Sequence, residues 1–254
     1  LEKRSIPITE FPQHWTVQLN DTHPAIAVAE LMRLLIDQYQ VGWDKAWNIT
    51  TSSVAYTNHT LLPEALEKWD LGLFNDLLPR HLEIIYEINW RFLQQLRLRY
   101  PGDDKILQKL SIIDEEGSKS VRMAHLATIG AHHINGVAAL HSDLIKRQLL
   151  PEFAELWPEK FTNVTNGVTP RRWVALSNPS LSNLLEKEVG PDWITNMELL
   201  KKLEGKKNDT NFLQKFEETK LNGKRKLASF IHSKTGILVD PSSLFDVQVK
   251  RIHQ

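Results

Sequence analysis

The segment SVAYTNHTLLPEALEKW, residues 53–69, contains a β-rich run that gives way to polar residues, a proline and a helix-forming stretch. Residues 54–56 are followed by Thr57 and then by Asn58, His59 and Thr60. A loop that faces solvent does not need this apolar lead-in, and a purely structural helix start needs only the threonine. The segment therefore predicts a strand whose end directs His59 at a ligand, with a helix after the proline.

Two other segments repeat this order of strand, polar residues, proline and helix. Residues 16–20 (TVQLN) predict a strand, and residues 21–24 (DTHP) lead into a helix that continues to about Tyr39. Residues 160–165 (KFTNVT) predict another strand, and residues 166–170 (NGVTP) precede the next helix. Helical crossovers between strands favour parallel pairing. The pattern predicts a helix-rich α/β protein.

Two further runs complete the expected elements. Residues 79–99 have the apolar spacing of one long helix that serves as scaffold. The last apolar run, residues 243–252, is strand-like and ends in the cations Lys250 and Arg251.

The polar clusters share one expected location. In open α/β sheets, ligands bind in the crevice outside the carboxyl ends of the strands. Asparagine, histidine, threonine and aspartate recognise hydroxyl groups, and a cationic patch binds phosphate, so the set suits a sugar beside a phosphate. The alternative, that Asp21, Thr22 and Thr169 only cap helices, stays open for those side chains. The residues that follow apolar β-runs are Asp21, His23, Asn58, His59, Thr60, Asn166, Thr169, Lys250 and Arg251.

Composition excludes several classes of protein. The 254 residues carry 31 Lys+Arg and 31 Asp+Glu, so no global field recruits nucleic acid or an anionic membrane. The absence of cysteine excludes disulfides, thiolate catalysis and cysteine-held zinc. The first residues, LEKRSIPITEF, contain neither a signal peptide nor an apolar span, which predicts a cytoplasmic protein.

Metal and hydrolase chemistries have weak support. The chain has no HExxH motif, and the adjacent His132 and His133 do not easily face one metal from a regular element, so no metal site is predicted. It has no GxGxxG or GxxxxGK[ST] phosphate loop either. The acidic residues 103–104 and 114–116 suggest a glycosidase pair, but their polar surroundings favour a solvated surface.

Five segments, in order along essentially the whole chain, carry a resemblance to a known family. They are LNDTHPAIAVAEL (19–31), AYTNHTLLPEALEKW (55–69), HHINGVAALHSDLIK (132–146), TNGVTPRRW (165–173) and SLFDVQVKRIH (243–253). Together they resemble the central part of a glycogen (α-glucan) phosphorylase. The resemblance implies a two-domain glycosyltransferase fold of the GT-B type with parallel Rossmann-like sheets. It also implies dependence on pyridoxal 5'-phosphate.

The reaction that the resemblance implies is the cleavage of α-1,4-glucan ends (glycogen, starch or maltodextrin) by inorganic phosphate, which gives glucose 1-phosphate. In the family, the residue that matches His59 lies near the 6-hydroxyl of the sugar, with its carbonyl beside the anomeric carbon. The match to Asn166 contacts the same hydroxyl. Asp21 and His23 match residues that line the adjacent pocket, and Asn58 and Thr60 flank the histidine as further substrate-binding candidates.

The implied cofactor and phosphate contacts come later in the chain. Trp173 matches a tryptophan packed near the cofactor, Lys250 a ligand of the cofactor phosphate, and Arg251 a ligand of the substrate phosphate. The lysine that carries the cofactor in the family is not within the matching segments. The complete enzyme is expected to be a homodimer under allosteric control in some members, and the isolated chain is expected to be inactive.

The resemblance also implies a division of the chain. Residues 1–165 correspond to the last part of the amino-terminal domain, and residues 166–254 to the beginning of the carboxyl-terminal, cofactor-binding domain. Ser111, Glu115 and Lys119 match a surface glucan-holding site of animal members, although an ordinary solvated loop is an alternative. Two other functions stay open: a glucan-binding module without catalysis, and a glycoside hydrolase.

Overall fold

The computed structural model describes residues 6–63, 66–247 and 249, and it divides into two compact units. Unit 1 comprises residues 1–166 and unit 2 comprises residues 167–254. The boundary expected from the sequence lies one residue before this division. Each unit has its own hydrophobic core.

A four-stranded parallel sheet forms the centre of unit 1, in the order β1-β2-β6-β7. Its strands are β1 (Val17–Asn20), β2 (Val54–Thr57), β6 (Ile134–Gly136) and β7 (Phe161–Asn163). The register pairs Val17 with Val54, and Ile134 pairs with both Tyr56 and Phe161. Every neighbouring pair is parallel, as the predicted crossovers require, so the predicted helix-rich α/β class is confirmed.

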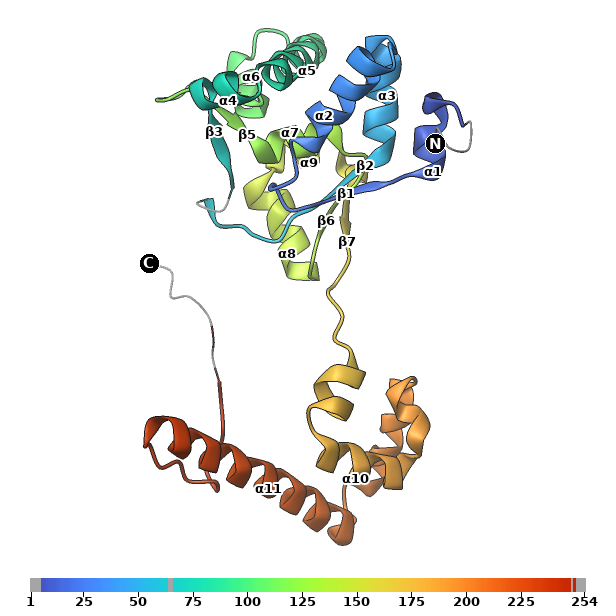
Figure 1. Cartoon of the computed structure of the whole chain (residues 1–254), viewed down its shortest axis with the longest axis vertical. Helices are drawn as coiled ribbons and strands as arrows, with labels where there is room; N and C mark the ends of the chain where they lie inside the picture. Colours follow the sequence, from blue (N-terminus) through green and yellow to red (C-terminus); the bar gives the residue numbers. More distant parts are fainter. Residues whose placement is uncertain (1–5, 64–65, 248, 250–254) are drawn as a thin grey trace. The chain divides into compact units, whose positions relative to one another are not determined.

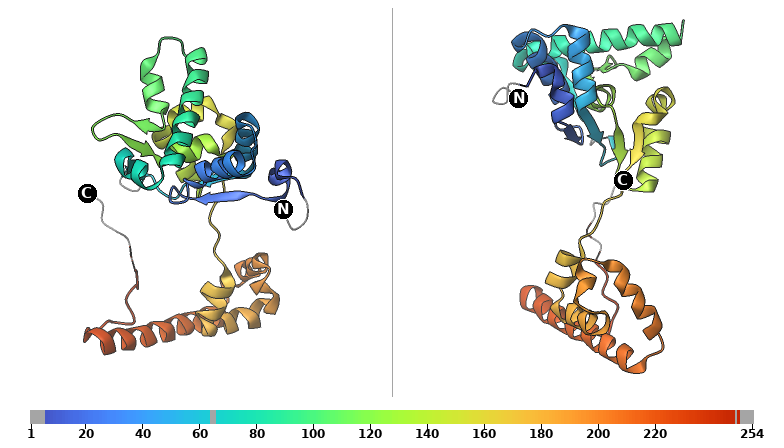
Figure 2. Two further views of the ribbon diagram at one scale, coloured as in Figure 1. Left: turned by 45° about the horizontal axis from the view of Figure 1, so that its top comes forward. Right: turned by 90° about the vertical axis from the view of Figure 1, so that its right-hand side faces the viewer.

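Helices connect these strands and carry most of the core. The longest in unit 1, α5, spans Pro79–Arg99, the range predicted from its apolar spacing. Helix α2 packs against α3, α5 and α7, and α3 also packs against α7 (Figures 1 and 2). The α-helices of unit 1 are α1 (Phe11–His14), α2 (Ala27–Arg33), α3 (Trp43–Ser53), α4 (Leu71–Leu77), α5, α6 (Asp104–Leu110), α7 (Met123–Gly130), α8 (Ala139–Leu144) and α9 (Pro151–Leu156).

Shorter helices extend several of these elements. The π-helices η3 and η5 continue α2 and α8 by one wide turn each, so the helix expected from residue 24 to about Tyr39 is present. These segments are the 3₁₀-helix η2 (Ile8–Glu10), η3 (Leu34–Gln38), η5 (Ile145–Leu149) and the 3₁₀-helix η6 (Pro158–Lys160).

The prediction of a helix directly after Pro63 is wrong for the described residues. Residues 68–70 instead form β3 (Lys68–Asp70), which pairs antiparallel with β5 (Ser120–Arg122), and β5 also pairs with β4 (Ile113–Asp114). Tertiary pairing overrides the local helix propensity of the segment, because Trp69 lies opposite Val121 and packs on Phe74.

The regular elements of unit 2 are all helices within its described residues. Its small core contains Leu185, Val189 and the fully buried Trp193. In Figure 2 the 26-residue helix α11 runs as one long segment beside the shorter helices. The helices are the π-helix η7 (Arg171–Leu176), α10 (Pro179–Val189), η8 (Pro191–Ile194), η9 (Met197–Lys206) and α11 (Thr210–Thr235).

The strand expected over residues 243–252 is absent from its described part. Residues 243–247 and 249 have no strand partner, and the side chains of Leu244 and Val249 are 89% and 87% exposed. A strand forms only when a neighbouring strand pairs with its backbone groups. The apolar alternation of these residues was therefore not sufficient to predict a strand.

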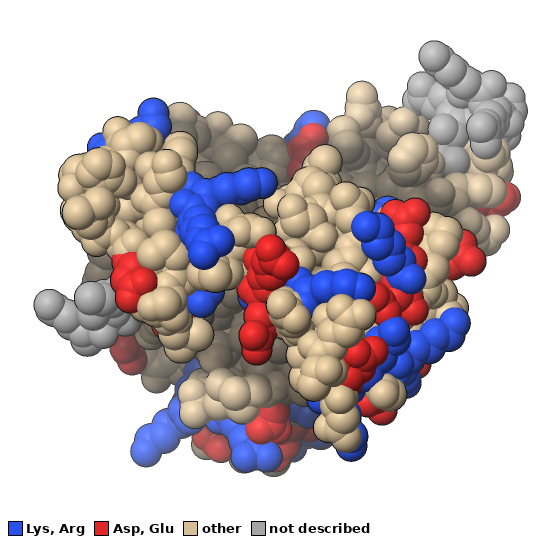
Figure 3. All heavy atoms as spheres, turned by 90° about the horizontal axis from the view of Figure 1, so that it is seen from below, with Lys and Arg blue, Asp and Glu red and all other residues tan. Residues whose placement is uncertain are grey.

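Charges are mixed on the surface, as the balanced composition suggests. On the face drawn in Figure 3, lysine and arginine side chains are interspersed with aspartate and glutamate. None of the helices in the described residues has the length and apolar character that crossing a membrane requires.

Candidate functional site

The backbone ladder of the parallel sheet continues past the carboxyl ends of its strands. Beyond β1, the Asp21 N–H donates to the Thr57 carbonyl at 2.8 Å, and beyond β2 the Asn58 N–H donates to the Asn135 carbonyl at 3.0 Å. These bonds hold the first residues after each strand in the plane of the sheet. The polar residues that the sequence singles out there are thus fixed on the ordered edge.

The same ladder reaches the end of unit 1. The Val164 N–H donates to the Gly136 carbonyl at 3.1 Å, and the Asn166 N–H donates to the Val137 carbonyl at 3.0 Å. Asn166 is therefore anchored to the residue after β6, and its side chain is exposed. The carboxyl edge consequently carries Asp21, the segment around Asn58 and Asn166 on one continuous hydrogen-bonded frame.

Asp21 has an unusual backbone and an unsatisfied side chain. Its φ of 76° lies in the left-handed region that non-glycine residues rarely adopt, and such conformations gather at functional sites. The residue is buried, and its Oδ1 has no hydrogen-bond partner among the described residues. The neighbouring Thr22 donates its hydroxyl proton to Glu67 at 2.9 Å. Asp21 thus has an acceptor oxygen available for a hydroxyl group.

His59 is exposed, whereas both of its neighbours support the turn. Its Nε2 donates to the side-chain oxygen of Asn20. Asn58 is fully buried; its amide donates to the Tyr56 hydroxyl at 3.0 Å, and its oxygen accepts from the Thr60 N–H at 3.1 Å. The Asn58 side chain therefore braces the loop that presents His59. Direct substrate contact by Asn58 stays a prediction.

His141 is a candidate that the sequence reasoning missed. Its Nδ1 accepts the Val137 N–H at 3.1 Å, so the proton of the neutral ring is on Nε2. That Nε2 is buried and has no partner among the described residues. Burial lowers the pKa of His141, the charge of His59 lowers it further, and the carboxylate of Asp21 opposes the shift. A neutral imidazole with a free N–H therefore lies near both Asp21 and His59.

A sequence signal for His141 existed. The residue lies in the first turn of α8, directly after β6, which is the same strand-to-helix position that marked the other candidates. Close packing supports this crossover, because a Cβ at Gly136 would come within 2.8 Å of the Ser142 Cα. Ser142 in turn donates its hydroxyl proton to Asn163 at 2.7 Å, which ties α8 to β7.

The other predicted residues are not part of this hydrogen-bonded ladder among the described residues. His23 is exposed in the loop after β1. Trp173 belongs to unit 2, on the π-helix η7, and is 64% exposed. Lys250 and Arg251 lie outside the described residues, so the cationic part of the predicted site has no structural description here.

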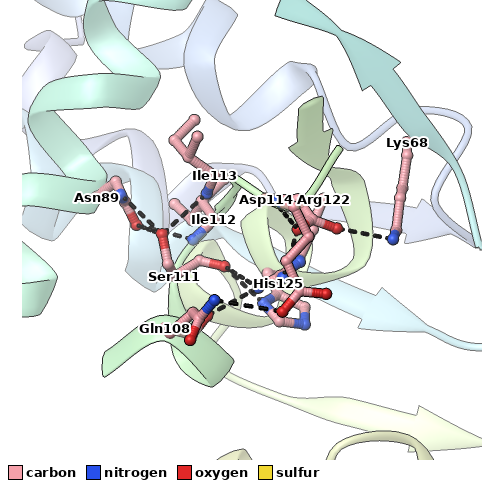
Figure 4. A network of polar contacts seen from close by, with 10 residues as sticks. Lys68, Asn89, Gln108, Ser111, Ile112, Ile113, Asp114, Arg122 and His125 are labelled. Carbon is pink, nitrogen blue, oxygen red and sulfur yellow. Dashed lines mark hydrogen bonds and ion pairs between the residues drawn. The ribbon is translucent and has the colours of Figure 1, made fainter. Parts of the chain in front are cut away.

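A second polar cluster, centred on Ser111 and Asp114, is structural (Figure 4). The interpretation of Asp114 as a solvated surface residue is wrong, because it is buried and forms ion pairs with Lys68 at 2.7 Å and Arg122 at 2.8 Å. Burial alone would raise the pKa of Asp114, but the hydrogen bonds from Lys68 and Arg122 outweigh it and lower that pKa to about 2. A carboxylate held in this way is a poor general acid.

The Ser111 hydroxyl is also occupied. It accepts from the Asn89 amide at 3.1 Å and from the Ile113 N–H at 3.1 Å, and the residue is buried (Figure 4). Of the three residues matched to a surface glucan site, only Glu115 and Lys119 are exposed. Ser111 therefore supports the loop and leaves any glucan contact to the other two.

Metal binding finds no geometric support within the part of the chain that the structure describes. There, no group of three or more histidine, aspartate or glutamate side chains could hold a metal ion. His132 and His133 do contact each other, with their Nδ1 atoms 2.7 Å apart, because they lie in the turn before β6 and not in a regular element.

The fold and this edge define a helix-rich α/β protein whose candidate ligand site lies at the carboxyl ends of parallel strands. The model of the carbohydrate phosphorylase family matches residues 1–254, and the chain belongs to this family.

Three relatives illustrate the similarity. The chain is 60% identical over 247 residues to a glycogen phosphorylase of Synechocystis sp., which is 97% of this chain and 29% of the relative. It is 49% identical to the glycogen phosphorylase of Chlamydia trachomatis, over 99% of this chain and 31% of the relative. It is 48% identical to the human liver form, over 96% of this chain and 29% of the relative. The chain thus spans less than a third of the length of these relatives.

Proposed function

We propose that this chain is part of an α-1,4-glucan phosphorylase, which cleaves glucan ends with inorganic phosphate and releases glucose 1-phosphate. The observation that carries the proposal is the ordered carboxyl edge, where Asp21, His59, His141 and Asn166 supply hydroxyl-recognising groups in a chain of the carbohydrate phosphorylase family. A glucosyl unit offers the hydroxyl groups that such donors and acceptors require.

In this proposal His59 orients the sugar. Its exposed ring contacts a hydroxyl, and its backbone carbonyl lies beside the anomeric carbon. Asn166 contacts the same hydroxyl, while Asp21 and His23 line the adjacent pocket. Asn58 and Thr60 act on the substrate mainly through the loop that they brace, because their mutual hydrogen bond fixes the residue between them.

The chemistry needs no nucleophilic side chain. Glycosyl transfer passes through an oxocarbenium-like transition state, so a carbonyl dipole and a bound phosphate both stabilise the positive charge that develops. Arg251 would bind the substrate phosphate. The role of the sheet edge is to hold these groups in fixed positions, because a displacement of about 1 Å can cost on the order of a hundredfold in rate.

Pyridoxal 5'-phosphate is the proposed cofactor, and when bound it would supply a phosphate group to the reaction. Of this chain's residues, Trp173 would pack near it and Lys250 would bind its phosphate. The exposed indole of Trp173 fits an aromatic contact, since it is open to a partner. The further proposals are a GT-B fold, a cytoplasmic location and a homodimer under allosteric control.

The two other functions have less support. A glycoside hydrolase needs two carboxylates that flank the scissile bond, and the buried Asp114 is already paired with two cations. A glucan-binding module without catalysis would not need the left-handed Asp21 or the neutral His141 at the sheet edge.

The test uses a full-length phosphorylase that carries this sequence. His59→Ala and Asn166→Ala should each lower kcat/KM for glucan phosphorolysis, mainly through kcat. A hydrogen bond lost in the transition state costs on the order of 1 to 3 kcal/mol, or roughly ten- to a hundredfold. Phosphate-dependent release of glucose 1-phosphate is the measurement.

Matched controls are His232→Ala and Asn211→Ala, which change the same residue types at exposed positions of α11. These variants should keep the parent rate. If all four variants retain the parent kcat/KM, the assignment of His59 and Asn166 is overturned. If the parent releases glucose without any requirement for phosphate, the hydrolase is the correct function.

A further inference from the structure

A cavity of about 750 Å³ lies in unit 1, away from the carboxyl edge of the sheet. It is formed by α3, α5, the end of α7 and the turns that precede β6 and β7. It therefore lies at the amino ends of those strands, opposite to the candidate glucan site. Cavities of this volume accommodate ligands of the size of a small organic molecule.

The walls of the cavity are aromatic. Four tryptophans and a phenylalanine line it: Trp43, Trp47, Trp90, Phe92 and Trp157. The rings of Phe92 and Trp157 lie 5.5 Å apart in a tilted arrangement. Such rings offer large, rigid apolar faces, against which a flat apolar body buries area at little cost in side-chain entropy.

One cation in this cavity lacks a counter-charge. The Lys160 ammonium lies 3.9 Å above the centre of the Trp157 ring, and among the described residues no carboxylate forms an ion pair with it. Burial lowers the pKa of Lys160 to about 8, and the charge of its exposed neighbour Glu159 opposes this shift only in part. The ammonium is protonated at pH 7, but its solvation is incomplete.

Arg91, the other cation that lines the cavity, has its charge balanced by ion pairs. Its guanidinium lies 5.0 Å from the Trp43 ring centre and pairs with Asp44 at 2.8 Å and Glu87 at 2.6 Å. The cavity is lined by two cations, Arg91 and Lys160, and by two carboxylates, Asp44 and Glu159. Of the two cations, Lys160 is the one without an ion pair among the described residues, so a ligand anion would pair with Lys160.

The histidine pair adds hydrogen-bonding groups to the cavity. His132 and His133 both line the cavity. The pKa of His132 is lowered, first by burial and then by the nearby His133 and Lys160. His132 therefore stays neutral at pH 7. The two Nδ1 atoms share one proton at 2.7 Å, so in a neutral pair one of the Nε2 atoms is a donor.

We propose that this cavity binds a small aromatic carboxylate, whose anionic group pairs with Lys160 and whose flat body lies against the tryptophan rings. A neutral sugar would use the rings and the polar groups but would leave the desolvated ammonium without a counter-charge. A carboxylate forms a charge-assisted hydrogen bond with the ammonium and restores its pKa. The site is independent of the proposed glucan chemistry, since it shares no residue with the carboxyl edge.

The experiment compares two probes of the same shape, one anionic and one neutral, on a full-length phosphorylase that carries this sequence. These are 2-naphthoate and its neutral analogue 2-naphthamide, and tryptophan fluorescence quenching with calorimetry gives each Kd. At pH 7 the carboxylate should bind on the order of tenfold more tightly than the amide. This preference should decline above about pH 8, as Lys160 loses its proton.

Variants locate the effect. Lys160→Met should abolish the preference for the carboxylate, Lys160→Arg should retain it, and Lys105→Met, at an exposed position of α6, should leave it unchanged. Near-ultraviolet circular dichroism checks that the variants are folded. Equal affinity of the parent for both probes, a preference that persists in folded Lys160→Met, or binding of maltose in place of naphthoate would each overturn the proposal.

Discussion

His125 is a buried histidine whose protonation the fold opposes. Its Nδ1–H donates to the Ser111 carbonyl at 2.9 Å, and its ring packs edge-on against Phe153 at 5.0 Å. Burial lowers the pKa of His125 to about 4, from an ordinary value of 6.5. The unfolded chain therefore binds a proton at a higher pH than the folded chain does, so acid favours unfolding.

This residue predicts a specific pH dependence of stability. The contribution of His125 is fully present above pH 6.5 and is lost as the pH falls towards 4. Between pH 7 and pH 5 the free energy of unfolding should fall by about 2 kcal/mol from this group. Urea unfolding at both values measures it. His125→Gln should remove this part of the dependence and His232→Gln should not; identical slopes for both variants would contradict the assignment.

At the residue scale, the sequence identified the edge but not all of its members. Asp21, His59 and Asn166 follow strands directly, and the ladder places their backbones along one edge. His141 escaped because it lies inside a helix, where a histidine is usually a surface residue. Asp114 was misjudged because Lys68, one of its partners, is 46 residues away, and a long-range ion pair leaves no local pattern.

At the scale of elements, Gly136 controls how α8 approaches the sheet. Gly136→Ala would place a Cβ 2.8 Å from the Ser142 Cα, which is backbone and cannot rotate away. We expect a loss of about 1 to 3 kcal/mol in the free energy of unfolding, because overpacking displaces the neighbouring helix. Thermal and urea unfolding measure the loss.

The control for this substitution is Gly223→Ala. Gly223 lies within α11, and an added Cβ there meets nothing within 4 Å. Its replacement should be neutral or should stabilise by up to about 1 kcal/mol, because alanine has the higher helix propensity. Equal destabilisation by both substitutions would show that close packing of α8 is not the cause.

Elements defined by a buried face were predictable, and elements defined by a distant partner were not. The helix α5 follows from its own spacing, and the starts of β1, β2 and β7 follow from short apolar runs. The strand β3 exists because β5 pairs with it, so the local sequence alone suggested a helix. Conversely, residues 243–247 have a strand pattern but no pairing strand.

At the scale of the molecule, we expect the isolated 254-residue chain to lack phosphorolytic activity. The chain spans less than a third of the curated relatives named above, and glycosyl transfer depends on groups that surround the substrate on several sides. Incubation of the purified chain with pyridoxal 5'-phosphate, glucan and phosphate should release no glucose 1-phosphate. Its intact mass must be confirmed first, and sustained release by a chain of that mass would refute the prediction.

The order of strands in the sheet also bears on how the chain folds during synthesis. Thr57 and Asn135 are 78 residues apart in sequence, yet they are joined across β2 and β6 by a side-chain hydrogen bond. A ribosome adds roughly 5 to 20 residues per second, so β2 waits about 4 to 16 seconds for its central partner. During that interval the edge of β2 that later pairs with β6 has no partner strand. Parallel pairing between segments so far apart in sequence is slow. The nascent chain is therefore expected to need a chaperone during these seconds, well before any glucan is encountered.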